Sequence, residues 1–433
     1  MEQFIRRRVL KFLTGQQSVV LSRRAPSREQ LRAQFEHLPS LGLYLHIPFC
    51  EQICPYCPYN REIYRDDVAA RYAAAVGTEI DFYAGLVGTR PITSFYIGGG
   101  TPTTMLRRGL EEMIGRVRRA FNLQCDIHME SHPNHLSADN LRAIRSIGVE
   151  HISIGVEALA AHHLKTLCRP YTVEGVKAAV RRAVSAGFTC VNVDMMFALP
   201  GQTQQEVADT GRQLVALGVD QIAAYPLFLF PYTAMGKLGR TTNHGALRSV
   251  RRRRMLRALE SVFYGAGYER TSTWAFTKRG VPRYCSVTVP AYIGLGASGG
   301  SYLRDVFYVN TFKAADYTRA LEEQRSPVAL CVEMSERMQR AAWLYWRVYE
   351  TRFSKADYRR RFGEPIEREY GRLLRLLDLA GLLEDDGEHV VLSDRGAFWL
   401  HALEDIVSID YISKLWGTSK ETAWPEEVVL ETS

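Results

Sequence analysis

The fold of this chain is decided by the stretch Tyr44-Leu-His-Ile-Pro-Phe-Cys-Glu-Gln-Ile-Cys-Pro-Tyr-Cys57. Its cysteines, Cys50, Cys54 and Cys57, have the spacing C-x3-C-x2-C and follow a short apolar run that is typical of a β-strand. Three thiolates on one tight loop can ligate three irons of a [4Fe–4S] cube. The spacing therefore predicts an iron–sulfur cluster just beyond the end of a strand.

Zinc is the alternative ligand for clustered cysteines. Structural zinc takes four ligands, often from two C-x2-C pairs, and the sequence has no second pair. A disulfide framework is not expected in a chain of 433 residues without a secretory signal. We therefore favour the cluster. Its fourth iron has no protein ligand, and we expect that iron to bind the amino and carboxyl groups of S-adenosylmethionine (SAM).

Composition and charge narrow the class of protein. A hydrophobic content of 46% with 24% charged residues is typical of a globular protein. The sequence has no apolar run as long as a membrane span, and basic residues interrupt its N-terminal apolar stretches, which argues against a secretory signal. We therefore expect a cytoplasmic protein. Its length suits one large domain and one small one.

The net charge of +8 favours anionic partners, such as carboxylated tetrapyrroles, anionic lipid head groups or nucleic acid. No basic stripe carries interleaved aromatic residues, so we expect no nucleic-acid binding. The run Arg251–Arg254 is expected to be a solvated helix face. Residues 1–40 form a basic N-terminal extension, in which residues 4–13 predict a short amphipathic helix. This helix would dock on the protein's own body or on a membrane surface.

Strands and helices alternate from residue 43 onward, which predicts an α/β fold with parallel strands and crossover helices. The predicted strands span residues 43–47, 94–97, 126–130, 151–156, 190–197 and 221–230. Barrel enzymes place their chemistry at the C-terminal ends of such strands. The cysteine loop, Gly98–Gly100 and Glu130 all fall at these ends.

The cysteine motif and its flanking residues resemble the radical SAM superfamily. More narrowly, the chain resembles the branch of oxygen-independent coproporphyrinogen III oxidase, which also holds heme chaperones and class C radical SAM methyltransferases. The resemblance implies a partial, TIM-like (β/α)6 barrel over residues 41–325. It also implies a [4Fe–4S] cluster, SAM, and reduced flavodoxin or ferredoxin as the electron donor.

Residues 326–433 predict a small C-terminal domain with helices at 335–349 and 365–380, a short hairpin, and a further helix from Asp394. This order is winged-helix-like. Such units often bind DNA, but the turn is acidic, which disfavours phosphate contact. The resemblance suggests a lid over the barrel mouth instead. The polar stretch after about Lys414 is expected to be loosely held.

The resemblance also assigns SAM-binding positions, residue by residue. The loop Gly98-Gly-Gly-Thr-Pro102 follows the second strand, and its glycines let the backbone approach a ligand closely. Positions that match the site of the first, cluster-bound SAM are Tyr44, Gly99, Glu130 and Gly300. Positions that match the site of a second SAM are Tyr56, Gly100, Thr101, Glu157, Arg169, Asp194 and Phe228.

Two departures from the family pattern bear on the reaction. The pattern Ser-Ile-Gly-Val-Gln reads Ser153-Ile-Gly-Val-Glu157 here. Glu157 would pair with a sulfonium or act as a base, or it is a plain structural replacement. Coproporphyrinogen oxidases carry an extra cysteine two residues after the third, where this chain has Tyr59. That difference disfavours oxidative decarboxylation.

The leading hypothesis is therefore a two-SAM C-methyltransferase with Glu157 as the candidate base. Its substrate would be a conjugated molecule with an sp² carbon: a menaquinone-like quinone, a tetrapyrrole or a natural-product heterocycle. The alternatives are a coproporphyrinogen III dehydrogenase-type oxidative decarboxylase and a heme-binding chaperone. No axial heme ligand can be named from the sequence, and His162 and His163 are expected to face solvent.

Overall fold

The computed structural model describes residues 11, 15–16, 18–239, 245–284 and 289–431. The amphipathic helix expected at residues 4–13 lies, apart from Lys11, outside the described residues. Within the described ranges, none of the helices combines the length and the apolar character needed to cross a bilayer.

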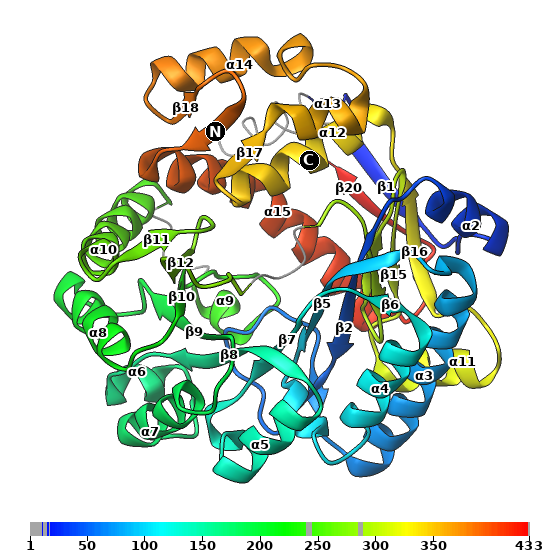
Figure 1. Ribbon diagram of the computed structural model, residues 1–433, viewed down its shortest axis with the longest axis horizontal. Helices are drawn as coiled ribbons and strands as arrows, with labels where there is room; N and C mark the ends of the chain where they lie inside the picture. Colours follow the sequence, from blue (N-terminus) through cyan, green and yellow to red (C-terminus); the bar gives the residue numbers. More distant parts are fainter. Residues whose placement is uncertain (1–10, 12–14, 17, 240–244, 285–288, 432–433) are drawn as a thin grey trace.

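Six parallel strands, with helices on their outer face, form the core of the molecule (Figure 1). The strands lie side by side in chain order: β2 (Leu41–Ile47), β5 (Pro91–Gly99), β7 (Ile127–Ser131), β8 (Val149–Glu157), β9 (Cys190–Phe197) and β10 (Gln221–Pro226). The crossover segments contain α3 (Asp66–Val87), α4 (Leu110–Ala120), α5 (Ala138–Ser146), α6 (Ala161–Thr166), α7 (Val173–Val184) and α8 (Gln204–Ala216). The predicted partial (β/α)6 barrel is confirmed.

The local sequence explains where these helices begin and which face they bury. Helix α8 begins with a capping box, in which Glu206 N donates to Thr203 Oγ1 and Thr203 N donates to the Glu206 carboxylate. In α7, Val176 and Val180 share one face and are fully buried against the sheet. Each such side chain contributes about 1.5–3 kcal/mol when it leaves water. The strands are buried on both faces, as expected for a parallel sheet under helices.

The sheet continues beyond both edges of the barrel. Past β2 it adds β13 (Tyr292–Leu295), β14 (Gly300–Tyr302), β15 (Val306–Asn310), β16 (Val328–Glu333), β1 (Ser18–Ser22) and β20 (Glu427–Glu431). Past β10 it adds β12 (Ala275–Lys278) and β11 (Tyr268–Arg270). Residues 18–22, near the start of the chain, thus pair with residues 427–431 near its end. Sequence analysis did not predict these long-range pairs.

The small C-terminal unit has the predicted winged-helix-like order. It contains α12 (Glu336–Tyr349), β17 (Arg352–Ser354), α13 (Lys355–Phe362), α14 (Glu367–Leu379), β18 (Leu383–Asp385) and β19 (His389–Leu392). Its three strands form a separate sheet in the order β17-β19-β18. Trp343, Tyr358 and Ile366 belong to a core of its own. In Figure 1 this unit lies at the open side of the ring of strands.

Three expectations about flanking segments are wrong. The sixth strand was expected at residues 221–230 but ends at Pro226. Leu227 N still donates to Phe197 O at 2.8 Å, and the chain then leaves the sheet. The stretch after Lys414 is ordered, since α15 (Asp394–Glu421) buries Leu415 completely and β20 follows it.

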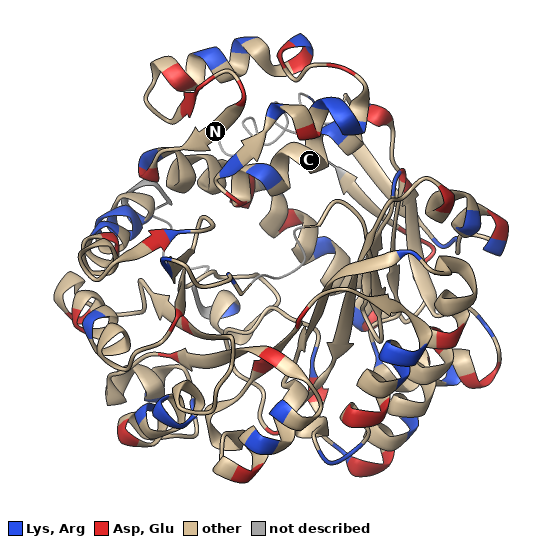
Figure 2. Ribbon diagram, viewed as in Figure 1, with Lys and Arg blue, Asp and Glu red and all other residues tan. Residues whose placement is uncertain are grey.

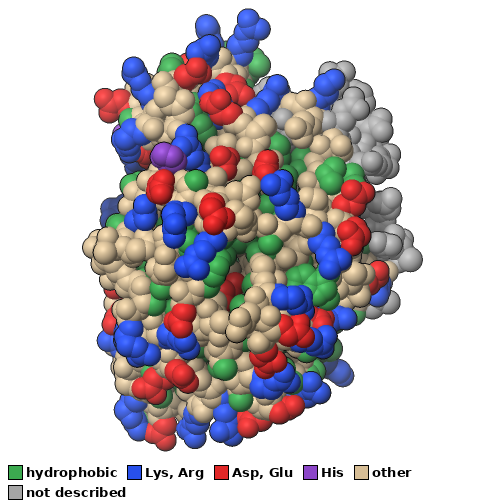
Figure 3. Space-filling model, turned by 90° about the vertical axis from the view of Figure 1, so that its right-hand side faces the viewer, with side chains coloured by type: hydrophobic (Ala, Val, Ile, Leu, Met, Phe, Trp, Pro, Cys, Tyr) green, Lys and Arg blue, Asp and Glu red, His purple; other side chains and the backbone are tan. Residues whose placement is uncertain are grey.

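The third wrong expectation concerns the run Arg251–Arg254 in α10 (Gly245–Gly265). The Arg253 side chain is only 14% exposed and pairs with Glu260 at 2.8 Å. Arg252 is half-buried against the ring of Phe228. The run is therefore not a uniformly solvated face, because α10 packs against α8. Elsewhere, basic and acidic residues alternate along the outer helices (Figure 2), and their side chains are intermixed over one face of the molecule (Figure 3).

One buried carboxyl group ties α3 to the added strands. Glu79 accepts hydrogen bonds from Tyr317 Oη at 2.6 Å, from Gly296 N at 2.8 Å and from Asn310 Nδ2 at 2.8 Å. Burial nevertheless raises the pKa of Glu79 from 4.5 to about 7. Between these two pH values the folded protein binds more protons than the unfolded chain. The contribution of Glu79 to stability is therefore complete below its unfolded pKa and is lost as the pH rises to about 7.

In the Glu79→Gln variant this part of the pH dependence should disappear. From about pH 5 to about pH 8, the free energy of unfolding of the wild type should fall relative to that of the variant by about 2.5 kcal/mol. Urea unfolding followed by circular dichroism at several pH values measures this difference. Glu323→Gln, which changes a half-exposed carboxylate, serves as the control. A wild-type-to-Glu79→Gln difference that stays constant with pH would contradict the assigned pKa.

Candidate functional site

The three cysteines lie on the loop that follows β2, at the C-terminal end of the barrel strands. Cys50 is buried in the short strand β3 (Phe49–Cys50), while Cys54 and Cys57 are half-buried, and all three are free thiols. The loop is compact because Cys57 N donates to Cys54 O at 3.3 Å and β3 pairs with β4 (Glu62–Ile63). The structure thus gathers the predicted ligands on one tight turn.

The surroundings of the thiols fit a polynuclear cluster better than zinc. Arg169 Nη1 lies 3.3 Å from Cys54 Sγ, and Thr101 Oγ1 lies 3.5 Å from Cys50 Sγ. Such donors stabilise thiolate ligands and cluster sulfurs. Three cysteine thiolates on one loop are the ligands that a [4Fe–4S] cluster with one open iron requires.

The glycine loop allows the cysteine loop to lie against the end of β5. Gly99 has φ of +120°, and a Cβ there would stand 2.5 Å from His46 Cε1. A Cβ on Gly100 would stand 2.8 Å from Phe49 O and 3.0 Å from Cys50 Sγ. Any larger residue at either position would push the two loops apart. The close packing of the cysteine loop against the glycine loop therefore requires glycine at both positions, apart from any role in ligand binding.

Glu130, at the end of β7, is held against the glycine loop. Its carboxylate accepts hydrogen bonds from Tyr96 Oη at 2.7 Å and from Gly99 N at 3.0 Å. Tyr44 stacks on Tyr96 with ring centroids 6.2 Å apart. The structure thus brings together Tyr44, Gly99 and Glu130, three of the four positions expected for the first SAM.

His46 orients Tyr44 through a defined tautomer. Its Nε2 lies 3.0 Å from Asn60 O, which can only accept, so Nε2 carries the proton. Its Nδ1 therefore accepts from Tyr44 Oη at 2.8 Å. Burial lowers the pKa of His46 to about 4, so this neutral form persists at neutral pH. His46 was not predicted as a site residue.

Two further carboxylates approach Glu130 from the next strands. A register shift between Gly155 and Glu157 marks a bulge at the end of β8, and Glu157 has φ of +65°, which is unfavourable for a residue with a side chain. Asp194, on β9, accepts from Ser153 Oγ at 2.8 Å and from Asn192 Nδ2 at 3.0 Å. The bulge and the positive φ re-aim the Glu157 side chain at the strand end.

Burial raises the pKa of all three carboxyl groups. That of Asp194 reaches about 7, because burial and the neighbouring Glu157 both oppose its ionisation. Those of Glu130 and Glu157 are raised chiefly by burial, against hydrogen bonds to Glu130 and the charge of Arg169 beside Glu157. Ionised Glu157 adds to the raised pKa of Glu130 and of Asp194, because like charges repel one another. Such a site suits a cationic ligand, such as a sulfonium or an ammonium group.

Arg169 is the cation that joins these carboxylates to the cysteine loop. Besides Cys54, its guanidinium contacts Gly155 O at 2.6 Å and lies 3.8 Å from Glu157. Tyr171 holds it in place, since Arg169 Nε donates to Tyr171 Oη at 2.6 Å and that hydroxyl donates to Gly155 O at 2.8 Å. Each of the three guanidinium nitrogens therefore donates a hydrogen bond within the protein.

The remaining expected positions are placed differently. Tyr56 is buried beside Glu157, and the Thr101 hydroxyl contacts the Cys50 sulfur. Phe228 instead packs on Trp274 and on His401, which belongs to α15. Gly300 lies in β14, where a Cβ would meet the ring of Phe307. The described contacts do not join Phe228 or Gly300 to the carboxylates. Tyr59 is 58% exposed.

Sequence reasoning missed the residues that support the site. They are His46, Tyr96, Ser153, Tyr171 and Asn192. Four of them lie on the barrel strands or their ends, at alternate positions that face the same side as the predicted residues. That alternation was the available signal, but polar residues at inward positions are also common as plain structural groups.

Comparisons with known proteins agree with this geometry. The radical SAM superfamily profile matches residues 44–214, and the HemN C-terminal domain profile matches residues 352–399. The heme chaperone HemW of Bacillus subtilis is 24% identical over 360 residues, which cover 82% of this chain and 95% of that protein. The oxygen-independent coproporphyrinogen III oxidase of Bradyrhizobium diazoefficiens is 29% identical over 310 residues, which cover 67% and 68%.

A solved structure gives the same fold over nearly the whole chain. Coproporphyrinogen III oxidase (HemN) from Escherichia coli superposes with a TM-score of 0.74 at 19% identity, covering 90% of this chain and 94% of that one. The cysteine loop at the end of a partial barrel defines the class of radical SAM proteins. The chain contains a radical SAM domain and a HemN C-terminal domain, and it resembles the branch of oxygen-independent coproporphyrinogen III oxidase and the heme chaperone HemW. A radical SAM domain implies a [4Fe–4S] cluster and SAM.

The sequence-based preference for a methyltransferase receives no support from these relatives. They are oxidases and heme chaperones, which correspond to the two alternatives of the sequence analysis. The number of SAM molecules stays a prediction.

Proposed function

We propose that this protein is a radical SAM enzyme whose substrate is a carboxylated tetrapyrrole. The relatives' descriptions as coproporphyrinogen III oxidase and heme chaperone support a tetrapyrrole. The observation that carries the proposal is a pair of arginines, Arg248 and Arg252, at the mouth of the barrel. They supply a site for substrate carboxylates.

The two arginines lie beside the loop that leaves β10, close to the end of the strands. Both donate to Leu227 O, and the Arg252 guanidinium lies 5.6 Å from the ring centroid of Phe228. Burial lowers the pKa of Arg252 to about 10, and Arg248 adds to that effect. Neither makes a salt bridge among the described residues, although Asp405 lies near enough to favour the charge of Arg252. Arg252 is half-buried and Arg248 is exposed beside it, so an anionic ligand at this place would pair with both guanidinium groups.

The residues of the site have complementary tasks in this proposal. Cys50, Cys54 and Cys57 would hold the cluster, which with bound SAM supplies a 5′-deoxyadenosyl radical. Glu130, with Tyr44 beside it, would bind the cationic end of SAM. The negative potential of Glu157 and Asp194 would retain a second positively charged group. The arginine pair would orient the substrate by its carboxylates, so that one carbon faces the radical.

Methyl transfer with two SAM molecules is the second candidate. The observation in its favour is the constellation of Glu157, Arg169 and Asp194, which the structure assembles next to the cluster loop. In this reaction Glu157 would remove a proton from the methylated intermediate, and its raised pKa suits a base. The tetrapyrrole would then be the acceptor of the methyl group.

Product analysis of the anaerobically reconstituted protein separates these reactions. The protein is incubated with reductant, methyl-deuterated SAM and either coproporphyrinogen III or heme, with menaquinone as the non-tetrapyrrole control. Decarboxylation would yield 5′-deoxyadenosine without S-adenosylhomocysteine, whereas methylation would yield both and a labelled product. Heme that binds without SAM cleavage would instead support a chaperone. Turnover with menaquinone alone would contradict the tetrapyrrole assignment.

The arginine pair can be tested separately. In the Arg248→Gln and Arg252→Gln variants, the KM for the tetrapyrrole should rise about 10-fold or more, because a charge-assisted hydrogen bond to a carboxylate is lost. SAM binding and iron content should not change. Arg254→Gln is the matched control, because Arg254 is an exposed arginine of the same helix with no described bond to Leu227. A KM equal to that of the wild type in all three variants would show that the arginine pair does not bind the substrate.

A further inference from the structure

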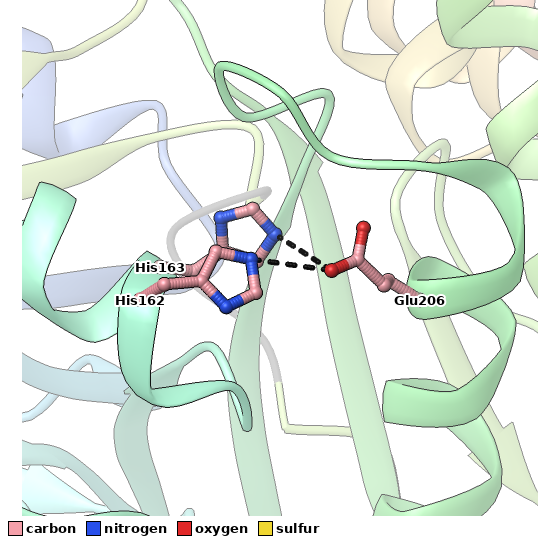
Figure 4. Close-up of side chains that lie close together, drawn as sticks. All are labelled: His162, His163 and Glu206. Atoms are coloured by element: carbon pink, nitrogen blue, oxygen red, sulfur yellow. Dashed lines mark ion pairs between the residues drawn. The ribbon is translucent and has the colours of Figure 1, made fainter.

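Two histidines and a glutamate converge between α6 and α8, away from the residues described above (Figure 4). His162 and His163 are neighbours in α6, and Glu206 lies in the first turn of α8. His162 Nε2 lies 3.2 Å and His163 Nε2 lies 3.8 Å from the same oxygen, Glu206 Oε1. The three atoms all lie within 4.8 Å of one another. This is the arrangement of ligands around one small ion.

His163 is the observation that points to a ligand. Its side chain is only 2% exposed, so the expectation that it faces solvent is wrong, whereas the His162 side chain is 64% exposed. Neither ring nitrogen of His163 has a hydrogen-bond partner. Buried polar atoms without partners are rare in folded proteins, and a site for a bound ion is one of their recognised explanations. The ring is turned toward Glu206 (Figure 4).

Glu206 is prepared to act as a ligand by the start of its own helix. Its Oε2 accepts from Thr203 N at 2.7 Å and from Thr203 Oγ1 at 2.9 Å. These bonds lower the pKa of Glu206 and leave Oε1 directed at the histidines. Imidazole nitrogens and a carboxylate oxygen are groups that bind metal ions.

We propose that His162, His163 and Glu206 bind one divalent metal ion, with water as the fourth ligand. The chemistry of the three side chains favours Zn²⁺. Two imidazoles and one carboxylate form a donor set that zinc favours over calcium or magnesium, which prefer oxygen. Zinc ligands stand about 2.0–2.2 Å from the ion. A small movement of the exposed His162 ring would bring the three atoms to such distances.

The ion would link α6 to α8. Leu164 and Leu167, at the end of α6, belong to the apolar cluster against which Cys54 and Cys57 pack. The chain then continues directly to Arg169. A metal at the start of α6 would therefore steady the helix that lies next to the cysteine loop, without touching the reacting groups. A protonated His162 paired with Glu206 would explain the 3.2 Å contact but would leave both nitrogens of His163 without partners.

The test uses protein whose [4Fe–4S] cluster is loaded, so that the three cysteines are occupied. Zinc is added, unbound metal is removed, and zinc and iron are measured together. We expect about one zinc per chain, and Glu206→Gln and His162→Ala should each weaken its binding at least about 10-fold. Glutamine keeps the capping box, so the first variant changes the ligand but not the helix start. X-ray absorption should show nitrogen and oxygen at about 2.0–2.1 Å from zinc and no sulfur at about 2.3 Å.

His389→Ala is the matched control, because His389 Nδ1 also faces a carboxylate, that of Asp386 at 3.9 Å, without a third ligand. Its zinc affinity should equal that of the wild type. Zinc that binds equally well to the Glu206→Gln and His162→Ala proteins would overturn the proposal, as would sulfur in the zinc shell or no zinc binding at all. None of these readouts depends on the reaction that the enzyme catalyses.

Discussion

A Cys54→Ser protein is expected to lose its iron–sulfur cluster and all SAM cleavage while it keeps its fold. A serine hydroxyl is far less acidic than a thiol and does not replace a thiolate at iron. Cys54 is only half-buried and its described polar contact is with Arg169, so the fold should lose little. Iron and sulfide content, visible absorption and 5′-deoxyadenosine formation report the site, and far-ultraviolet circular dichroism reports the fold.

Cys168→Ser is the control for this experiment. Cys168 is an exposed free thiol just after α6, outside the cysteine loop. Its replacement should leave iron content and SAM cleavage unchanged. A Cys54→Ser protein with the iron content and activity of the wild type would exclude Cys54 as a cluster ligand.

The second large effect is expected for Glu130→Gln. Glutamine retains the shape of the side chain and one acceptor, but it removes the negative charge beside the glycine loop. SAM affinity should fall about 10- to 100-fold, because a hydrogen bond to a charged group is exchanged for a weaker neutral one. Equilibrium dialysis of the cluster-loaded protein under anaerobic conditions measures this change, and the iron content should stay constant.

Glu150→Gln provides the comparison for Glu130→Gln. Glu150 lies near the N-terminal end of β8, whereas Glu130 lies near the C-terminal end of β7. Glu150 pairs with Arg145 on the outside of the barrel. Its replacement should not alter SAM binding. Equal SAM affinity for wild type and Glu130→Gln would show that Glu130 orders the glycine loop only.

The sequence was sufficient to predict the barrel and its metal-binding loop. The six strands were recognised from apolar runs of strand length, and their helices from periodic apolar faces. Both signals are local, because burial on two faces or on one stripe marks each segment by itself. The cysteine spacing is also local. Three ligands within eight residues define a tight loop whatever the rest of the chain does.

Pairings between distant residues could not be predicted. Strand β1 joins β20 across about four hundred residues, and the apolar residues of β20 do not reveal that partner. The burial of His163 and Arg252 likewise depends on which helices pack on α6 and α10. Sequence reasoning treated both as solvated, because histidine and arginine are exposed more often than not. Long-range packing, not local pattern, decides such cases.

The sequence by itself determined that three thiolates stand on one loop at the end of a strand, within an α/β chain of six strand–helix units. The tertiary structure decided what surrounds that loop. It brought Glu130, Glu157 and Asp194 from three neighbouring strands to one end of the barrel, with Arg169 between them and the cysteines. The physical reason is that parallel strands place their C-terminal residues at one edge, where groups far apart in the sequence share a single electrostatic environment.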